Sequence, residues 1–248
     1  MMIGARTAAW AKSGGGVPTA RDYVQDGLLD IRDGIENEGW GVHSSSTDWF
    51  DLTGNNTKWT MTGYQFSDKG LILNGQTTRT KVGNINSSVI DTLYTRANSG
   101  QKNTFEICMH FISKSKERVI FANTYSQYDK TAYYFGLNNS YLAGGCFGSW
   151  NIFLTNKYPQ DGEYFTASGI TDKNWSDGYY NAQFIKGREA IQKNMNKNTE
   201  LYFMPSISGV WVGKVYGEIY CIRVYARELS ATEIAHNYAI DKARFNLP

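Results

Sequence analysis

The sequence predicts an all-β fold, and two observations carry this prediction. Aromatic residues make up 15% of the 248 residues, with 17 Tyr, 12 Phe and 7 Trp, and 25 Gly are available for turns. Within 104–111, every second residue from Phe105 to Phe111 is apolar, as a strand with one buried face requires. Aromatic enrichment combined with frequent turn residues is typical of domains built from many short strands.

The predicted strands follow one another from residue 27 to residue 225. The first covers 27–34. In the next segment, 49–56, Trp49 and Leu52 are expected to pack, and 54–56 to form a tight turn. Further strands are expected at 104–111, 119–122, 132–137, 201–204, 210–213 and 217–225. With 248 residues, the chain is long enough for one β domain of about 200 to 230 residues and a tail.

The end of the chain predicts a capped helix. Ser230 and Glu233 have the S-x-x-E spacing of a capping box, in which each side chain accepts a hydrogen bond from the other residue's backbone N–H. Leu229 and Ile234 occupy the two positions of a hydrophobic staple, which fixes the angle at which the chain enters the helix. We therefore expect a short C-terminal helix directly after the last strand.

This last strand, turn and helix resemble the C-terminal signature of the laminin-G-like, concanavalin A-like lectin/glucanase superfamily, roughly G-x-I-D-x-V-R-I-Y-N-R-A-L-S-x-x-E-I. The matching residues are Ile219, Ile222, Arg223, Val224, Tyr225, Arg227, Leu229, Ser230, Glu233 and Ile234. The sequence departs from the signature at Tyr220 and Cys221, where the family commonly has acidic residues. Residues 49–56 are similar to the family's W-x-D-L-S-G-N-G segment, and residues 178–187 resemble the family segment that runs into a Y-V-N-G-like turn. The resemblance implies a two-sheet antiparallel β-sandwich (a jelly roll) over residues 23–248.

Composition argues against several classes of partner. With 25 Lys and Arg against 23 Asp and Glu, the formal charge is +2, which gives no electrostatic basis for binding nucleic acid or an anionic membrane. Arg6, Thr7 and Lys12 interrupt any apolar run at the N-terminus. We therefore expect no secretory signal peptide, and we expect synthesis in a bacterial host cytoplasm.

The three cysteines, at 108, 146 and 221, are expected to be free and mostly buried, because an odd number without C-x-x-C spacing argues against a disulfide framework.

No catalytic site is expected. Superfamily glucanases carry an E-x-D-x-x-E or E-x-D-x-E strand that places two glutamates on one face, and this sequence has none. The nearest acidic pairs are Glu36 with Glu38 and Asp161 with Glu163, in turn-like surroundings. We therefore expect a protein that is not an enzyme.

No metal or other cofactor is expected either. His43, His110 and His236 are far apart and lack metal-ligand spacing. The alternative left open is calcium, which related lectins hold with loop oxygens. The residues that could supply such oxygens are Asp48, Asp51, Asp129, Asn138 and Asn139.

Carbohydrate binding needs aromatic rings for the apolar face of a sugar and amide or carboxylate groups for its hydroxyls. The stretch 125–151 is rich in both. The predicted glycan-binding residues are Tyr128, Asp129, Asn138, Asn139, Tyr141, Trp150 and Asn151. Further aromatic residues follow at Tyr158, Tyr164, Trp175 and Tyr179. The alternative is that these aromatic residues fill the core or an oligomer interface.

Residues 1–22 are expected to form an N-terminal arm that anchors the protein in an assembly. The arm has too little apolar surface to fold alone, and its triple Gly raises the entropic cost of ordering it. We expect its contacts with other virion proteins, or with further copies of this chain in a homo-oligomer, to come from Ala5, Arg6, Ala8, Ala9 and Trp10.

The sequence most resembles laminin-G-like jelly-roll proteins encoded by phages and prophages of gut bacteria. The resemblance extends to the short tail followed by 26–28 and to the segment 33–41. It implies a non-enzymatic virion surface protein, a head or tail decoration or fibre component, whose sandwich engages host glycans. The alternative is a bacterial carbohydrate-binding module or a glycan-processing enzyme of the same superfamily.

Overall fold

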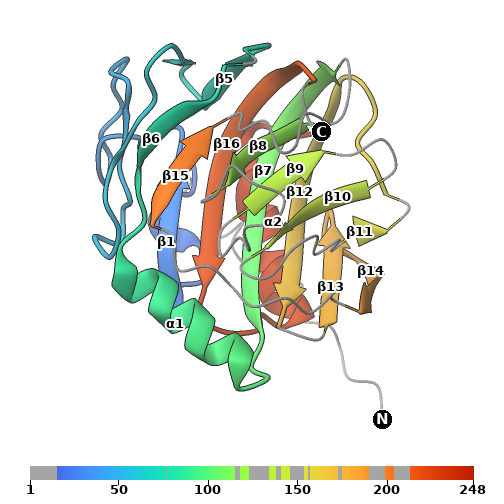
Figure 1. Cartoon of the computed structure of the whole chain (residues 1–248). Coiled ribbons are helices and arrows are strands. Elements are labelled where there is room, and N and C mark those ends of the chain that lie inside the picture. The colour runs from blue at the N-terminus through green and yellow to red at the C-terminus, as the bar shows by residue number, and fades with distance from the viewer. Residues whose placement is uncertain are drawn as a thin grey trace.

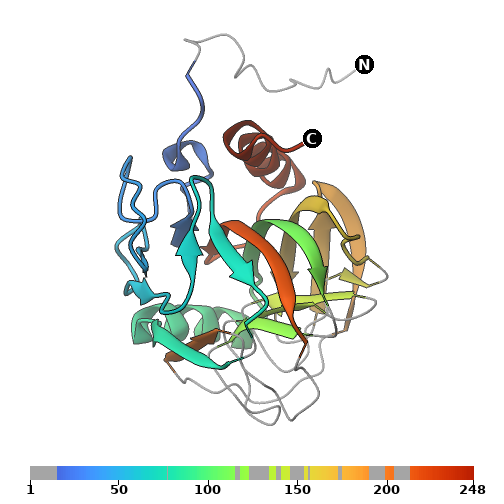
Figure 2. The same cartoon turned by 90° about the horizontal axis from the view of Figure 1, so that it is seen from above.

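The structure is a computed structural model that describes residues 16–76, 78–114, 118–122, 134–137, 141–145, 154–155, 157–172, 175–189, 199–203 and 213–248. Two antiparallel sheets face each other, and a C-terminal helix lies outside one of them (Figure 1). Seen from above, the order of layers is helix, large sheet and small sheet (Figure 2). The predicted two-sheet β-sandwich is confirmed.

The large sheet is the longer and more continuous of the two. Its order is β14 (Gln183–Glu189), β13 (Trp175–Tyr180), β12 (Glu163–Thr171), β7 (Asn103–Lys114), β16 (Val215–Tyr225), β5 (Leu71–Asn74) and β4 (Gln65–Phe66). One edge of β16 is shared between two strands. β5 pairs with its first half, over Tyr216–Ile219, and β1 (Leu28–Asp33) with its second half, over Cys221–Tyr225.

The small sheet has the order β11 (Leu154–Thr155), β10 (Tyr141–Gly145), β9 (Tyr134–Leu137), β8 (Arg118–Ala122), β15 (Glu200–Phe203) and β6 (Thr80–Asn84). A separate two-stranded ladder joins β2 (Asp48–Trp49) to β3 (Trp59–Thr60). The predicted strands 27–34, 104–111, 119–122, 201–204 and 217–225 correspond closely to β1, β7, β8, β15 and β16. The predicted strand 132–137 is described from residue 134, as β9, and 210–213 lies almost wholly outside the described residues.

The segment 178–187 contains a turn, as its resemblance to the family segment implies: Asn181 and Ala182 have positive φ angles of 49° and 61° and turn the chain from β13 into β14. The helix α1 (Ser87–Asn98) was not predicted. Its buried residues are Val89, Ile90, Leu93 and Ala97, a helical spacing that packs one face of α1 against the core.

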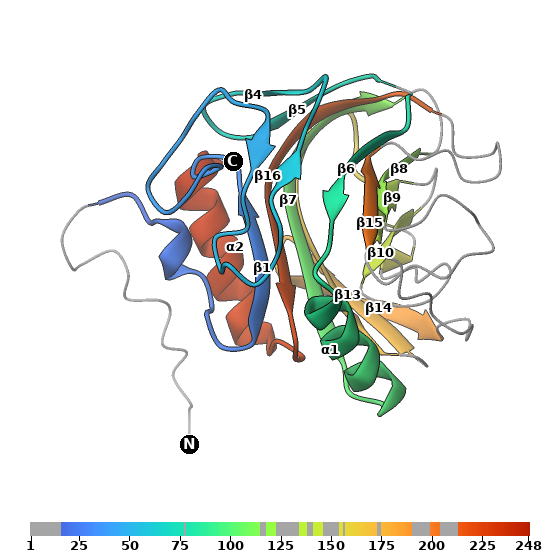
Figure 3. The ribbon, with the colours of Figure 1, turned by 60° about the vertical axis from the view of Figure 1, so that its left-hand side comes forward.

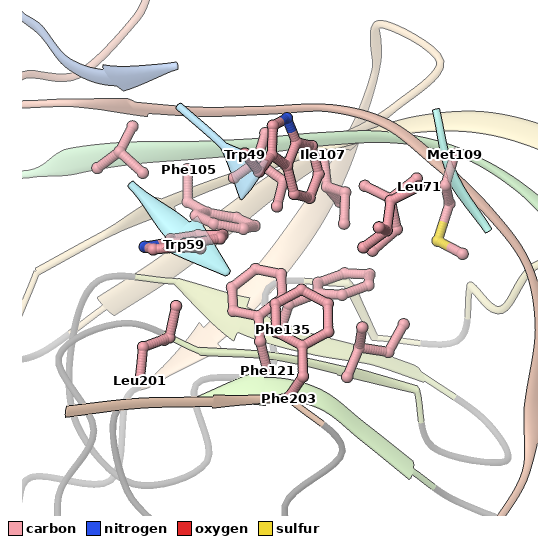
Figure 4. Packing of buried hydrophobic residues seen from close by; sticks show 14 of the residues in the cluster. Trp49, Trp59, Leu71, Phe105, Ile107, Met109, Phe121, Phe135, Leu201 and Phe203 are labelled. Atoms are coloured by element: carbon pink, nitrogen blue, oxygen red, sulfur yellow. The ribbon is translucent and has the colours of Figure 1, made fainter. Parts of the chain in front are cut away.

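Aromatic side chains fill the space between the sheets (Figure 4). The alternating apolar residues of β7, from Phe105 to Phe111, all lie on this inner face and are fully buried, as predicted. Across the core, Phe121 stacks on Phe203 with ring centroids 5.6 Å apart. Trp59 meets Trp49 edge-on at 6.0 Å, an arrangement that aromatic pairs prefer.

The segment 49–56 is structural, as the sequence predicted. Trp49 and Leu52 are buried, and Gly54 has a φ of 76° in the turn. The Asp51 carboxylate accepts hydrogen bonds from the backbone N–H groups of Ile31, Thr53 and Asn56 at 2.8–3.0 Å. Asp51 thereby ties this loop to β1.

The helix α2 (Ala231–Phe245) packs on the outer face of the large sheet, beside β1 (Figure 3). The predicted capping box is present: the Glu233 N–H donates to Ser230 Oγ at 3.3 Å, and the Ser230 N–H donates to Glu233 Oε2 at 2.8 Å. Leu229 and Ile234 are buried together. The helix ends at Asn246, which has a left-handed φ of 55°.

A buried polar network joins α2 to the sheet. The Arg223 guanidinium of β16 donates to Glu106 Oε2 at 2.9 Å and to both oxygens of Asp241, on α2, at 2.6 and 2.8 Å. Asn237 of α2 donates to Glu106 at 2.7 Å, and the Tyr23 hydroxyl donates to Asp241 at 2.8 Å. All three charged side chains are at most 1% exposed, so each depends on the others to be charged inside the protein.

Cys108 and Cys221 lie in the same layer, as free, buried thiols on neighbouring strands. Burial is the main cause that raises the pKa of both thiols well above the ordinary value. They therefore behave as small apolar side chains, as predicted. Cys146 lies outside the described residues.

The last residues of the predicted arm pack on the protein's own domain. The short 3-10 helix η2 (Ala20–Asp22) places the Ala20 N–H 2.9 Å from Glu36 Oε1, and Arg244 of α2 donates to the Pro18 carbonyl at 3.1 Å. Residues 18–22 therefore belong structurally with the sandwich. The predicted contact residues Ala5, Arg6, Ala8, Ala9 and Trp10 lie outside the described residues.

Candidate functional site

The outer face of the large sheet is covered by α2 along only part of its width and length. Beyond the end of α2, the strand register places a row of side chains side by side: Glu218 faces His110 on one side and Ile72 on the other, His110 faces Tyr164, and Ile72 faces Gln65. A second, shorter row sets Tyr216 between Asn74 and Ser113. We call these rows, with Ile112, the open face: Gln65, Ile72, Asn74, His110, Ile112, Ser113, Tyr164, Tyr216 and Glu218.

Apolar surface is concentrated on the open face. Three of the six large apolar side chains that stand exposed in the described part of the chain lie here: Ile112 at 48%, Tyr216 at 38% and Ile72 at 36%. Ile112 is left without a register partner where β16 and β7 shift against each other, between Tyr216 and Gly217. A Cβ on Gly217 would lie 2.4 Å from the His110 carbonyl oxygen, so only glycine allows β16 so close to β7 at this shift.

The Tyr216 ring lies against a glycine at the end of β5. Gly75, directly after β5, has a φ of 76°, and a Cβ added to it would lie 2.4 Å from the ring of Tyr216. The ring thus packs against bare backbone on one side while 38% of the residue stays exposed. Such a ring is a preformed surface for an apolar ligand face.

A stack of aromatic rings connects the open face to the end of α2. The rings of His110 and Tyr164 are parallel to within 1° with centroids 3.9 Å apart, Tyr164 is followed by Tyr220 at 6.4 Å, and Tyr220 by Phe245 of α2 at 4.9 Å. Burial lowers the pKa of His110 below its ordinary value, although Glu218 and a hydrogen bond to the Gly162 backbone oppose this shift. The imidazole is therefore neutral at neutral pH.

Glu218 is the fixed hydrogen-bond acceptor of the open face. Its carboxylate accepts a hydrogen bond from the Ser67 hydroxyl. This donor restrains the orientation of the carboxylate. Since a carboxylate has more lone pairs than this one bond uses, acceptor positions remain toward the solvent.

The predicted glycan-binding stretch is for the most part outside the described residues. Tyr128, Asp129, Asn138, Asn139, Trp150 and Asn151 all lie there. Tyr141 is the first residue of β10, where it pairs with Thr155.

Three of the further aromatic residues are spread over the molecule. Tyr158 packs edge-on against Phe111, with centroids 5.7 Å apart, Tyr164 belongs to the open face, and Tyr179 meets Phe184 at 5.4 Å. The structure thus does not bring these three together into one site.

The acidic residues considered for catalysis include one with a clear structural role. Glu36 accepts hydrogen bonds from the Ala20 and Gly41 N–H groups and pairs with Arg244 at 3.1 Å, so its oxygens are occupied by the fold. Glu163 accepts a hydrogen bond from the Gln160 N–H at 2.7 Å across a turn.

Of the five residues considered as calcium ligands, the structure describes Asp48 and Asp51. Asp51 serves the 49–56 loop, and Asp48 binds Lys58 and the Thr60 hydroxyl. Asp129, Asn138 and Asn139 are outside the described residues. Among the residues that the structure describes, no group of three or more His, Cys, Asp or Glu side chains is placed to hold a metal ion.

Sequence reasoning found only part of the open face. The alternation of β7 predicts that His110 points outward, and it does. Ile112, an apolar residue on the same outward face, was the available signal that this face is not a plain solvated surface. The partners from β5 and β16 could not be assigned, because their register with β7 depends on pairing between distant parts of the chain.

No protein-family model and no curated protein matches this sequence. Solved structures do match its fold. The sialidase of Trypanosoma rangeli is 13% identical, with a TM-score of 0.59, over 92% of this chain and 34% of that one. The same sialidase in complex with sialic acid matches over 94% of this chain at 11% identity, with a TM-score of 0.59.

The binding domain of botulinum neurotoxin DC in complex with SialylT also matches, at 12% identity and a TM-score of 0.60, over 87% of this chain and 52% of that one. The chain therefore spans about a third of the sialidase and about half of the toxin fragment. At this level of identity the likeness shows the fold alone, a two-sheet antiparallel β-sandwich. In the described part of the chain, no helix combines the length and apolar character needed to span a membrane.

Proposed function

We propose that this protein is a non-enzymatic, lectin-like module that binds glycans through the open face. The observation that carries the proposal is the open face itself: exposed apolar side chains alternate there with fixed polar groups on adjacent strands of a rigid sheet. Tyr216 and Ile112 offer apolar surface for the C–H face of a sugar ring. Glu218 and Asn74 flank them and bind hydroxyl groups.

The fold supports this assignment. Proteins of like fold have been solved with sialic acid and with SialylT, which makes a sugar ligand a natural candidate for a sandwich of this type. Fold likeness does not place the ligand, so the location on the open face rests on the residues of this chain. The predicted stretch 125–151 remains a second candidate region for glycan contacts.

The absence of catalysis is part of the proposal. It is supported by the lack of a glucanase-type acidic strand in the sequence and by the structural use of Glu36. Incubating the protein with the glycans it binds should release no reducing ends above a heat-killed control. Release that is lost on substituting Glu36, Glu38, Asp161 or Glu163 would show instead a glycan-processing enzyme.

Tyr216→Ala is expected to weaken glycan binding about tenfold or more, because it removes the exposed ring and the contact area that the ring offers. The size is taken from the stacking of nucleic-acid bases on aromatic side chains, where one ring contributes on the order of 1–3 kcal/mol. The measurement is a glycan array followed by calorimetric titration of the best ligand. The matched control is Phe184→Ala, which truncates another exposed aromatic residue, 57% exposed, away from the open face. Equal affinities for wild type and Tyr216→Ala would move the site elsewhere.

We also propose that the module is a surface component of a phage virion, where residues 1–17 anchor it to other virion proteins or to further copies of the chain. The support is the sequence resemblance to phage-encoded jelly-roll proteins and the composition of the arm. A protein that lacks residues 1–17 should stay folded and soluble, since η2 and its contacts with Glu36 and α2 are retained. It should no longer enter the particle or oligomer, measured by sedimentation against the full chain; normal incorporation would refute the anchoring role.

A further inference from the structure

We infer that the open face selects neutral glycans over sialylated ones, and that Glu218 sets this selectivity by accepting hydrogen bonds from neighbouring sugar hydroxyls. The inference rests on the proposed function and names the ligand class of the same face. It departs from what the likeness in fold alone would suggest, since the like-folded proteins were solved with sialic acid and SialylT.

The charge of the open face favours neutral ligands. Among its nine residues, all of them described, Glu218 is the one acidic residue and none is Lys or Arg, while burial lowers the pKa of His110. An anionic sugar would have to lie beside this carboxylate. Like charges brought together at a partly dehydrated contact oppose binding, which is how interfaces reject wrong partners.

Three basic side chains on neighbouring elements are engaged elsewhere. Lys69 Nζ donates to the Phe245 carbonyl at the end of α2, at 3.1 Å. Lys114 lies over the Tyr158 ring at 4.5 Å, on the side of the sheet that carries Val215 rather than Tyr216. Lys242 on α2 lies over Tyr238 at 5.9 Å. None of these three offers the paired, charge-assisted contact by which proteins usually hold a carboxylate.

The hydrogen bonding of Glu218 also favours neutral ligands. The Ser67 hydroxyl donates to the carboxylate, which restrains its orientation before a ligand arrives. What remains toward the solvent are acceptor positions only. Sugar hydroxyls and acetamido N–H groups can donate to them, whereas the carboxylate of a sialic acid cannot. The side chains around Glu218 therefore match a neutral ligand in both charge and hydrogen-bond polarity.

The test compares lactose-type neutral oligosaccharides with the same oligosaccharides capped by sialic acid, on the full-length protein. Wild type is expected to bind the uncapped member of each pair about tenfold or more tightly. Glu218→Gln keeps the shape and removes the charge, so it should weaken uncapped binding about tenfold and bring the two affinities close together. Phe184→Ala is again the control, and thermal unfolding of each variant checks that the fold is kept.

A second measurement uses wild type alone and does not depend on any variant folding. Raising the salt concentration should strengthen binding of the sialylated member relative to the neutral one, because salt screens the repulsion from Glu218. Equal or tighter binding of sialylated ligands by wild type at low salt would overturn the selectivity while leaving glycan binding intact. An unchanged ratio in Glu218→Gln would remove the role of Glu218. Binding of neither ligand class would overturn the proposed function and the selectivity with it.

Discussion

Arg223→Met is expected to lower the free energy of unfolding by about 3–5 kcal/mol, the usual effect of removing one partner from a buried ion pair. The guanidinium contacts three residues at once: it binds Glu106, it binds both oxygens of Asp241, and it stacks over the Tyr23 ring at 4.2 Å. Without it, the carboxylates of Glu106 and Asp241 stay buried beneath α2 with no cation to offset their charge. The cost comes from this uncompensated burial more than from the lost bonds.

The measurement is the midpoint and slope of urea unfolding for wild type and variant at neutral pH. Arg227→Met is the matched control, since Arg227 comes from the same closing segment and also pairs with an α2 carboxylate, Glu233, but near the surface. That substitution should cost at most about 1 kcal/mol. A similar small effect at both positions would mean that the network under α2 does not hold the helix on the sheet.

Arg223→Lys separates charge from geometry. Lysine keeps the positive charge but cannot form the forked contacts that Arg223 makes with Asp241 and Glu106 together, so it should restore only part of the lost stability. Full recovery with lysine would show that charge alone, and not the fork, is what the buried carboxylates require.

The parts of the fold that the sequence predicts best are those whose signals are local. The capping box of Ser230 and Glu233, the staple of Leu229 and Ile234, and the alternation from Phe105 to Phe111 each depend on residues a few positions apart. Their geometry follows from the 3.6-residue and two-residue periods of helix and strand. The structure confirms all three.

The parts that were missed have other causes. The helix α1 carries Val89, Ile90, Leu93 and Ala97 at helical spacing, yet Asn86 makes no side-chain cap bond and its first turn has no acidic residue, so the usual start signals are weak. The open face and the network around Arg223 depend on register between strands that are far apart in the sequence. Glu218 meets His110 across more than a hundred residues of chain, and no local pattern encodes that pairing.

Ile222→Ala is expected to lower the free energy of unfolding by about 2–5 kcal/mol, because it deletes buried carbon atoms and leaves a cavity. Ile222 is fully buried on the inner face of β16, opposite Ile107 of β7 and Arg32 of β1. The strand is paired on both edges here and cannot easily shift to fill the space, which favours the upper part of that range. Chemical denaturation at fixed pH gives the size of the effect.

Ser230→Ala tests the other half of the closing motif. It removes the cap on the Glu233 N–H and should cost about 1 kcal/mol, since the cap is at the surface and water can replace it in part. The ratio of the two effects is the informative quantity, because strand and helix would respond alike if the segment were a loosely attached tail. Two negligible, equal shifts would contradict the packing of β16 and α2. A large shift for Ile222→Ala with a small one for Ser230→Ala is what a strand at the centre of the large sheet, followed by a surface-capped helix, requires.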